Sequence, residues 1–172
     1  NSLLGKLVNG LADFCAEQAA AGAAAIQLFD SWVGTLAPAE YRQSVLPHVQ
    51  RLVALVRASG VPVIYFSTGT TGYLELLGAS GADVLSLDWR VDMAAAWERV
   101  QALPHPPRAL QGNLDPTLLL APPAVREAAT ARLLEAMRDK PGYIFNLGHG
   151  ILPSTPVEAV QGLVAQVQAA GC

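Results

Sequence analysis

Short apolar, β-prone runs alternate along the chain with stretches whose apolar positions have helical spacing. The predicted strands cover residues 24–29, 62–67, 83–88, 108–114 and 142–147. The predicted helices cover residues 3–20, 41–59, about 73–79, 91–101, 122–139 and 156–169. A short, unbroken apolar run is typical of a strand buried on both faces of a parallel sheet. A helix followed by five strand–helix units predicts an α/β fold with right-handed crossovers, either doubly wound or closed into a barrel.

Glycine and proline lie where this alternation needs them. Gly22, Gly60 and Gly81 fall where a helix must turn into a strand, and Pro122 and Pro156 fall near helix starts. The pattern shows no low-complexity tail and no boundary to a second domain. We therefore predict one domain, or part of one.

Composition and charge narrow the function classes. The chain has 172 residues, of which 52% are hydrophobic and 15% charged, so it can bury a sizeable core as a soluble globular protein. Residues 18–29 are uncharged but fall short of the roughly 20 apolar residues that a membrane span requires, so no transmembrane helix is expected. The net charge of −3, with scattered Lys and Arg, argues against a nucleic-acid partner.

The cysteines and the start of the chain indicate the compartment and the extent of the protein. Cys15 and Cys172 do not make a disulfide framework, and no cleavable signal pattern opens the chain, so we expect a reducing cytoplasm. The first residue is Asn1 rather than Met, and a predicted helix begins at once. We therefore expect a fragment of a longer protein.

Polar side chains gather where the predicted strands end, which in an α/β barrel is where the active site forms. Phe29, Trp32 and Trp89 add aromatic surface at the same level. The pattern predicts a wide cleft with a polar floor and aromatic walls, suited to a sizeable organic ligand. The polar strand-end residues are Gln27, Asp30, Ser31, Ser67, Thr68, Thr70, Asp88, Arg90, Gln111, Asn113, Asp115, Asn146 and His149.

Many of these residues have a structural interpretation as well. Asp30 and Asp115 are typical helix caps, and Gln111 and Asn113 are suited to bonding loop backbone. For these four the structural interpretation is favoured, whereas for Asp88 both interpretations stand.

His149 ends the most informative segment, residues 142–150. An apolar run leads into this histidine, and the glycines on either side let backbone and ligand approach it closely. A lone histidine after a strand is more often structural than catalytic. A functional role for His149 is favoured more strongly because the other predicted strands end in polar residues too.

Other chemistries fit the sequence less well. No GxGxxG or GxxxxGK[ST] supplies the phosphate cradle of a dinucleotide or nucleoside triphosphate site. His48 lies in a predicted helix and His105 in a proline-rich linker, and no cysteine lies at a strand end, so no metal site is expected. A hydrolase could be assembled from Ser31, His149 and a strand-end aspartate, but the G-x-S-x-G turn is missing.

Four segments together resemble the uroporphyrinogen decarboxylase family in order and spacing: QLFDS (27–31), LDW (87–89), QGNLDP (111–116) and NLGHGI (146–151). That family has a single (β/α)8 barrel. The resemblance therefore implies an incomplete TIM-barrel fold of about five βα units, in which residues 1–172 are the C-terminal portion of one barrel domain, strands four to eight. It also implies a cytoplasmic homodimer that decarboxylates the four acetate side chains of uroporphyrinogen III to give coproporphyrinogen III without a cofactor.

The resemblance carries over three site residues. Ser31 matches the family's serine or threonine that contacts a substrate carboxylate, and His149 matches its cleft-lining histidine. Phe29 matches an aromatic position of the cleft wall. The resemblance thus implies His149 as a catalytic residue and Ser31, His149 and Phe29 as substrate-binding residues, with no metal.

The family's cationic and acidic site residues would lie upstream of Asn1. These are an arginine-rich segment, a pyrrole-binding aspartate and a tyrosine, and no residue here replaces them. A substrate with eight carboxylates calls for several cationic donors, preferably arginines. Only Arg90 lies near a predicted strand end, at a position where the family pattern does not call for an arginine. We therefore expect the chain alone to be inactive.

Two alternatives remain. Corrinoid-dependent methyltransferases share this barrel but resemble zinc enzymes, with His and Cys ligands where this chain has Ser67-Thr68-Gly69-Thr70 and His149. The second alternative is a non-catalytic partial barrel that pairs with another polypeptide. Its exposed edges would be the apolar strands 24–29 and 142–147, which are prone to association.

Overall fold

The computed structural model describes residues 2–171 and divides into two compact units. Asn1 and Cys172, on which the expected chain start and the second cysteine fall, lie outside the described residues. Unit 1 comprises residues up to 85 together with 99–108, and unit 2 comprises 86–98 and the residues from 109 onward.

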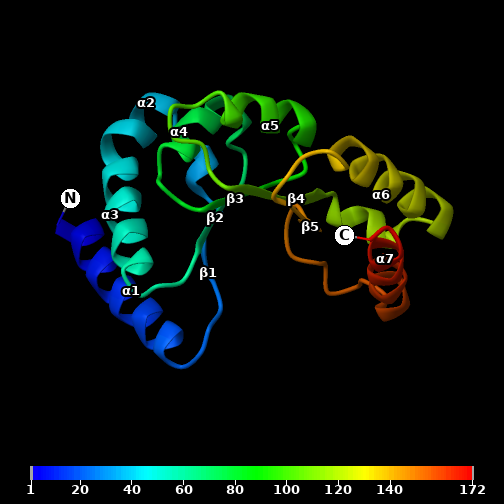
Figure 1. Cartoon of the computed structure of the whole chain (residues 1–172), viewed down its shortest axis with the longest axis horizontal. Helices are drawn as coiled ribbons and strands as arrows, with labels where there is room; N and C mark the ends of the chain where they lie inside the picture. The colour runs from blue at the N-terminus through cyan, green and yellow to red at the C-terminus, as the bar shows by residue number, and fades with distance from the viewer. Residues whose placement is uncertain (1, 172) are drawn as a thin grey trace. The chain divides into compact units, whose positions relative to one another are not determined.

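The elements alternate as the sequence pattern predicts (Figure 1). Unit 1 contains α1 (Ser2–Ala20), β1 (Ile26–Asp30), η1 (Val33–Thr35), α2 (Pro38–Glu40), η2 (Tyr41–Val45), α3 (Leu46–Arg57), β2 (Val63–Ser67), η3 (Thr71–Tyr73) and α4 (Leu74–Gly78). Unit 2 contains β4 (Ala109–Leu114), η4 (Pro116–Leu120), α6 (Pro123–Met137), β5 (Tyr143–Leu147) and α7 (Val157–Ala169). Strand β3 (Val84–Leu87) and helix α5 (Met93–Gln101) each contain a point at which the chain passes between the units, and a third such point lies between Arg108 and Ala109.

The five predicted strands are all present, and none of their ends differs from the prediction by more than two residues. Their order in the sheet is β1-β2-β3-β4-β5. Strand β1 pairs in parallel with β2, from Ile26 opposite Val63 to Asp30 opposite Ser67. Strand β4 pairs in parallel with β5. The predicted α/β fold is therefore confirmed, and β1 and β5 are the two end strands of this order.

One predicted helix is interrupted. Residues 41–59 were expected to form a single helix, but the chain forms a π-helical turn, η2, before α3 begins at Leu46. Pro47 in the first turn of α3 has no N–H to donate to the preceding turn, which accounts for the change of winding there. The short helices η1, α2 and η4 were not predicted.

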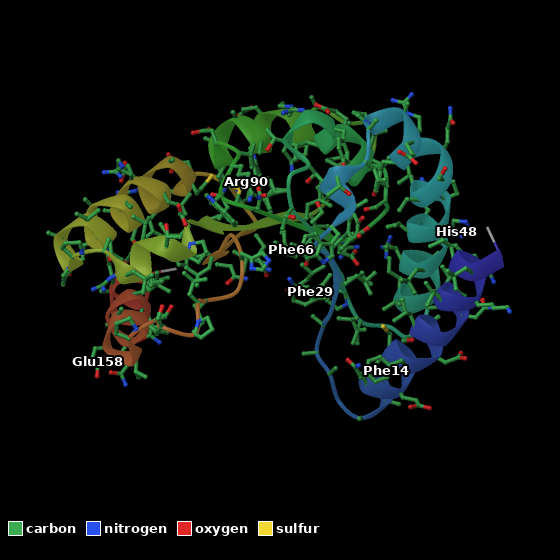
Figure 2. All side chains as sticks on the ribbon, turned by 180° about the vertical axis from the view of Figure 1, so that it is seen from behind. Phe14, Phe29, His48, Phe66, Arg90 and Glu158 are labelled. Atoms are coloured by element: carbon green, nitrogen blue, oxygen red, sulfur yellow. The ribbon has the colours of Figure 1, made fainter. Side chains whose placement is uncertain are left out.

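Alternation along the strands of unit 1 separates two faces. Leu28 and Asp30 share a face with Tyr65, whereas Phe29 lies on the other face, where its ring meets that of Phe66 edge-on at 5.5 Å (Figure 2). Helices α1 and α3 pack side by side (Figure 1). Asp30 and Phe29, adjacent in sequence, therefore lie in different environments.

A buried chain of hydroxyl groups lies on the Asp30 side of these strands. The Tyr65 hydroxyl donates to Asp30 Oδ2 at 2.8 Å, and the Tyr41 and Tyr65 hydroxyl oxygens lie 3.1 Å apart. Tyr41 of η2 is fully buried. Asp30 was expected as a helix cap, which is wrong: the N-cap of η1 is Trp32, with no side-chain bond. Instead, Asp30 ties the end of β1 to β2 and η2.

Burial controls the ionisation of this chain. It raises the pKa of the Asp30 carboxyl above its ordinary 3.8, and the hydrogen bond from Tyr65 offsets only part of that rise. Burial also raises the pKa of Tyr41 to about 12 and raises that of Tyr65. The protonated carboxyl and the neutral phenols are therefore the forms that folding favours.

The core of unit 2 lies between its strands and α6 and α7. Leu114, Leu119, Ala159 and Leu163 form its buried centre, and Phe145 packs against it. On the opposite face of the same strands, Asn113 lies opposite Asn146 in the β4–β5 register. Among the described residues, no helix is both long and apolar enough to cross a membrane.

We predict that Asp30→Asn gains stability over the parent chain as the pH rises: the free energy of unfolding of the variant minus that of the parent should increase with pH. The folded-state pKa of Asp30 lies above its unfolded value, so its contribution is fully present below pH 3.8 and is lost as pH rises through the folded pKa. An asparagine does not titrate and still accepts from Tyr65. Urea unfolding of both chains from about pH 3 to about pH 7 should show the difference growing with pH. A constant or shrinking difference in unfolding free energy would contradict the raised pKa of Asp30.

We also predict that Tyr65→Phe lowers the free energy of unfolding by about 1–3 kcal/mol, because it leaves buried polar groups unpaired.

Candidate active site

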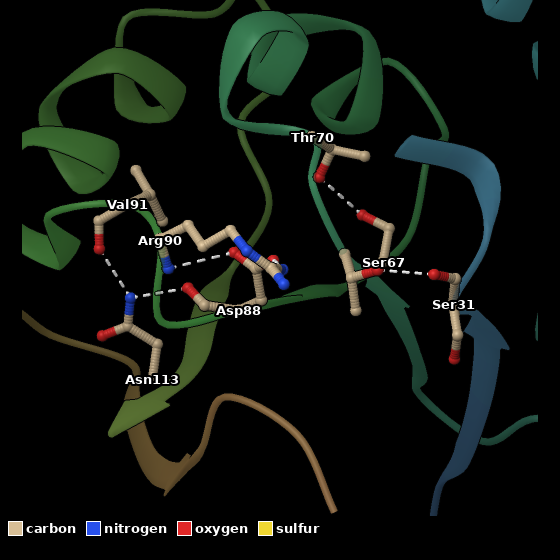
Figure 3. Close-up of polar contacts among 8 residues, drawn as sticks. Ser31, Ser67, Thr70, Asp88, Arg90, Val91 and Asn113 are labelled. Carbon is tan, nitrogen blue, oxygen red and sulfur yellow. Dashed lines mark hydrogen bonds and ion pairs between the residues drawn. The ribbon is translucent and has the colours of Figure 1, made fainter. Parts of the chain in front are cut away.

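The turn after β1 is held against the turn after β2. The Thr68 hydroxyl donates to the Ser31 carbonyl oxygen at 2.5 Å (Figure 3). A Cβ added to Gly34 would lie 2.0 Å from the Thr68 carbonyl oxygen, so only glycine allows this approach. Within the part of the chain that the structure describes, Ser31 Oγ makes no hydrogen bond. The backbone thus fixes Ser31 and leaves its hydroxyl available to a ligand.

Aromatic side chains flank this turn. Phe29 is 71% and Trp32 is 83% exposed, although both are large and apolar. They border a groove of about 560 Å³ between α1 and β1, which also includes Leu7, Leu11 and Phe14. An exposed apolar surface of this kind marks an interaction site or a binding groove. Phe29 and Trp32 thus present exposed aromatic surface at the end of β1, and the role of Phe29 in the wall of a substrate cleft stays a prediction.

Two further strand-end residues of unit 1 bond to each other. Ser67 and Thr70 are almost fully buried, and their hydroxyl oxygens lie 2.8 Å apart. Their polarity is satisfied inside the loop, which closes the end of β2. This pair is structural, and the loop contributes to the site by positioning Ser31 through Thr68.

In unit 2, the turn after β3 is fixed by one amide group. The Asn113 Nδ2 donates to the Asp88 carbonyl at 2.9 Å and to the Val91 carbonyl at 2.7 Å, so it bridges both ends of the turn (Figure 3). The Asp88 carboxylate, 3% exposed, accepts from the Arg90 backbone N–H at 3.2 Å and from Arg90 Nη1 at 2.5 Å. Asn113 thus bonds loop backbone as expected.

This turn presents Trp89 and Arg90 beside His149. The Arg90 guanidinium carbon lies 4.2 Å from the centre of the Trp89 ring, in a cation–π contact. The His149 ring meets the Trp89 ring edge-on at a centroid distance of 6.4 Å. His149 and Arg90 are exposed, whereas Trp89 is half-buried. The three side chains form one exposed cluster.

Close backbone packing sets the position of His149. A Cβ on Gly148 would lie 2.5 Å from the Trp89 backbone nitrogen, so only glycine fits there. The Gly148 N–H donates to the Leu114 carbonyl at 2.7 Å. The glycine before His149 therefore brings the turn after β5 onto the turn after β3, as the sequence led us to expect for a close approach at this histidine.

The remaining strand-end residues of unit 2 have local partners. Asp115 caps η4 by accepting from the Thr117 N–H at 2.8 Å, which confirms the capping interpretation. Gln111 donates to the Ser86 hydroxyl at 3.0 Å, and its expected bond to loop backbone stays a prediction. The exposed Asn146 accepts from its neighbour's backbone N–H.

No group of three His, Cys, Asp or Glu residues within the described range could hold a metal ion. Cys15 is a free, buried residue of α1, and burial raises the pKa of its thiol. Among the polar groups at the strand ends, the Ser31 hydroxyl, the His149 imidazole and the Arg90 guanidinium are of the kinds that can donate hydrogen bonds to an anionic organic ligand.

Some residues that shape the site gave little signal in the sequence. Thr68 and Asn113 were recognised as polar strand-end residues, but their backbone acceptors lie far away in the chain. The bond of Tyr65 to Asp30 and the contact of Tyr41 with Tyr65 were not expected. The contact between Trp89 and Arg90 could have been predicted from the sequence only because the two residues are adjacent and follow a predicted strand.

Comparison with known proteins places this arrangement in a family. The sequence model of the family described as uroporphyrinogen decarboxylase (URO-D) matches residues 1–170. Proteins named uroporphyrinogen decarboxylase from Solibacter usitatus and Thermus thermophilus are each 46% identical, with 96% of this chain and 47% of the relative covered. The protein of that name from Streptomyces coelicolor is 48% identical, with 96% and 45% covered. The chain thus spans about half the length of the curated relatives that it matches.

A solved structure shares the fold. A methyltransferase from Methanosarcina mazei matches with a TM-score of 0.79 and 22% identity, over 96% of this chain and 48% of that protein. At this identity the likeness concerns the fold alone, and it agrees with a partial barrel. Because the family model extends over residues 1–170, the chain belongs to the uroporphyrinogen decarboxylase family.

Proposed function

We propose that this chain is the C-terminal portion of the single barrel domain of a uroporphyrinogen decarboxylase. The complete protein would remove carbon dioxide from the four acetate side chains of uroporphyrinogen III and release coproporphyrinogen III. The observation that carries the proposal is the 46% identity, over 96% of this chain, to proteins named for that activity. The donors that follow β1, β3 and β5, namely Ser31, Arg90 and His149, support it, because they suit a polycarboxylate.

The reaction needs proton transfer and charge stabilisation rather than a metal or an organic cofactor. Protonation of a pyrrole α-carbon makes the ring an electron sink. The C–C bond to the acetate carboxylate then breaks, its electron pair flows into the ring, carbon dioxide leaves, and the resulting methylene is protonated to a methyl group. The α-carbon finally loses its added proton, which restores the aromatic pyrrole, so that one proton in total replaces each carbon dioxide. A protein accelerates such steps by placing an acid and by stabilising charge as it moves.

In this proposal Ser31 and His149 bind substrate carboxylates. Ser31 Oγ has no partner among the described residues and can donate a hydrogen bond. His149 is exposed beside Trp89, so its imidazole can approach a substrate arm. Phe29 supplies apolar surface for the flat pyrrole rings. The pyrrole-binding carboxylate and the other cationic groups would come from the part of the relatives that this chain does not match.

The complete protein is further proposed to act as a homodimer in the cytoplasm, on the strength of the family resemblance. Methyl transfer, the activity in the name of the structural neighbour, is not favoured, because zinc-dependent chemistry would need His and Cys ligands. Thr68 and His149 occupy the turns where such ligands would lie.

We predict that Ser31→Ala and His149→Ala each lower kcat/KM in a hybrid protein. The hybrid joins this chain to the complementary half of the Thermus thermophilus protein, and turnover of uroporphyrinogen III is followed by chromatography of the oxidised porphyrins. Loss of a hydrogen bond to a charged group costs about 1.5–3 kcal/mol, which corresponds to roughly a 10- to 150-fold loss. Ser154→Ala and His105→Ala, both at exposed positions, are the matched controls. Unchanged kinetics in both site variants, with the melting temperature preserved, would make Ser31 and His149 structural.

We also predict that the 172-residue chain alone does not decarboxylate uroporphyrinogen. Within the described residues, Arg90 is the only arginine that closely follows a strand, which is too few cations for eight carboxylates. The assay incubates the purified chain with reduced substrate under nitrogen and measures coproporphyrinogen, with the hybrid as the positive control. Turnover by the chain alone would show that its own residues suffice.

A further inference from the structure

We propose that Arg90, Trp89 and His149 form a subsite for a carboxylate arm of a tetrapyrrole, with Arg90 as its main donor. The inference rests on the proposed function for the identity of the ligand. It goes beyond that function by assigning substrate binding to Arg90, which the proposed function does not use. The cluster lies wholly within unit 2.

The turn that bears Arg90 is rigid before any ligand arrives. Asn113 donates to the backbone carbonyls at both ends of the turn, and the buried Asp88 carboxylate accepts from the Arg90 backbone N–H. A donor held in place by such bonds loses little conformational freedom when a ligand binds. Asp88 and Asn113 are therefore positioning residues for Arg90.

The guanidinium is oriented by two contacts and retains unused donors. Nη1 bonds the Asp88 carboxylate, and the flat face lies against Trp89. The Arg90 side chain is nevertheless 52% exposed. Arginine has five N–H donors in a planar fork, so one bond to Asp88 leaves further donors in the same plane that can reach a second carboxylate. The stacking on Trp89 sets the direction of that plane.

His149 lies against the ring on which Arg90 stacks. The Trp89 ring contacts the guanidinium and, edge-on, the imidazole. Gly148 packs against the Trp89 backbone and fixes this arrangement. A carboxylate held by the Arg90 fork thus comes within the neighbourhood of His149, while the exposed part of Trp89 gives apolar contact to the ring that carries the arm.

The competing explanation is that Arg90 only neutralises the buried Asp88. The two explanations predict opposite changes in the binding of a polyanion by Asp88→Asn. If general attraction governs the binding of a polyanion, removing this negative charge strengthens it. If Asp88 aims the guanidinium, its loss weakens binding even though the chain becomes more positive.

The binding test uses uroporphyrin III, the stable oxidised octacarboxylate, with the full 172-residue chain. Fluorescence anisotropy of the porphyrin reports the Kd at two salt concentrations. Arg90→Gln should raise the Kd about tenfold and Arg90→Lys by less, because lysine keeps the charge but loses the fork. Arg138→Gln removes one positive charge from a 70%-exposed position of unit 2 and should leave the Kd nearly unchanged. Circular dichroism and melting temperature verify that each variant folds.

Two further variants test the geometry. Asp88→Asn should raise the Kd, and a lower Kd would overturn the positioning role. Gly148→Ala should raise the Kd because its Cβ would collide with the Trp89 backbone, whereas a Cβ at Gly150 meets nothing within 4 Å, so Gly150→Ala is the matched control. Equal effects of Arg90→Gln and Arg138→Gln, or no effect of Arg90→Gln, would overturn the subsite, as would a chain that does not bind uroporphyrin III.

Kinetics of the hybrid protein separate this inference from the proposed function. Arg90→Gln should raise KM for uroporphyrinogen III by about tenfold and change kcat much less, because the subsite binds an arm in both the ground state and the transition state. An active hybrid whose KM is indifferent to Arg90 would overturn the inference and leave the function standing. An inactive hybrid, with Arg90-dependent porphyrin binding by the chain, would overturn the function and leave the subsite standing.

Discussion

The two-residue alternation of side chains along paired parallel strands determines what each strand-end residue can do. In unit 1 the register sets Phe29 opposite Phe66 and Leu28 opposite Tyr65. A single step along β1 therefore separates an exposed aromatic ring from a carboxyl bonded to a buried phenol. The same rule in unit 2 directs Leu114 toward the helices and Asn113 toward the opposite face. The register therefore decides which side chains reach which environment, because a shift by one residue would exchange the side chains of the two faces of the sheet.

Direct backbone contact between neighbouring turns is the second constraint, and glycine permits it. Gly34 meets the Thr68 carbonyl in unit 1, and Gly148 meets the Trp89 backbone in unit 2. In each unit the glycine lies close in sequence to a residue whose side chain is offered to a ligand. The turns that carry these residues are thus held in place by main-chain contacts.

Most of the fold could be predicted from the sequence because buried parallel strands are short apolar runs and helices carry their own period. The features that the sequence did not predict are the π-helical turn before α3 and the hydrogen bonds between side chains that are distant in sequence. Pro47 changed the start of α3, although its position in an otherwise helical pattern gave no sign of a π-turn. For the site, the sequence pattern could indicate that Asp30 and Asn113 lie near strand ends. The bonds that they make depend on Tyr65 and on the turn at Asp88, which come close to them only in the folded chain.

The charge near the strand ends is balanced rather than positive. Within the described residues, Arg90 is the one arginine that closely follows a strand, and it is paired with Asp88, so the pair adds no net positive charge. Such a pair can direct hydrogen bonds toward a carboxylate, but it cannot supply the field that several carboxylates require. Orientation and net charge are separable properties of a binding site. The turns of this chain supply orientation, and under the proposed function the net positive charge would come from the part of the relatives that this chain does not match.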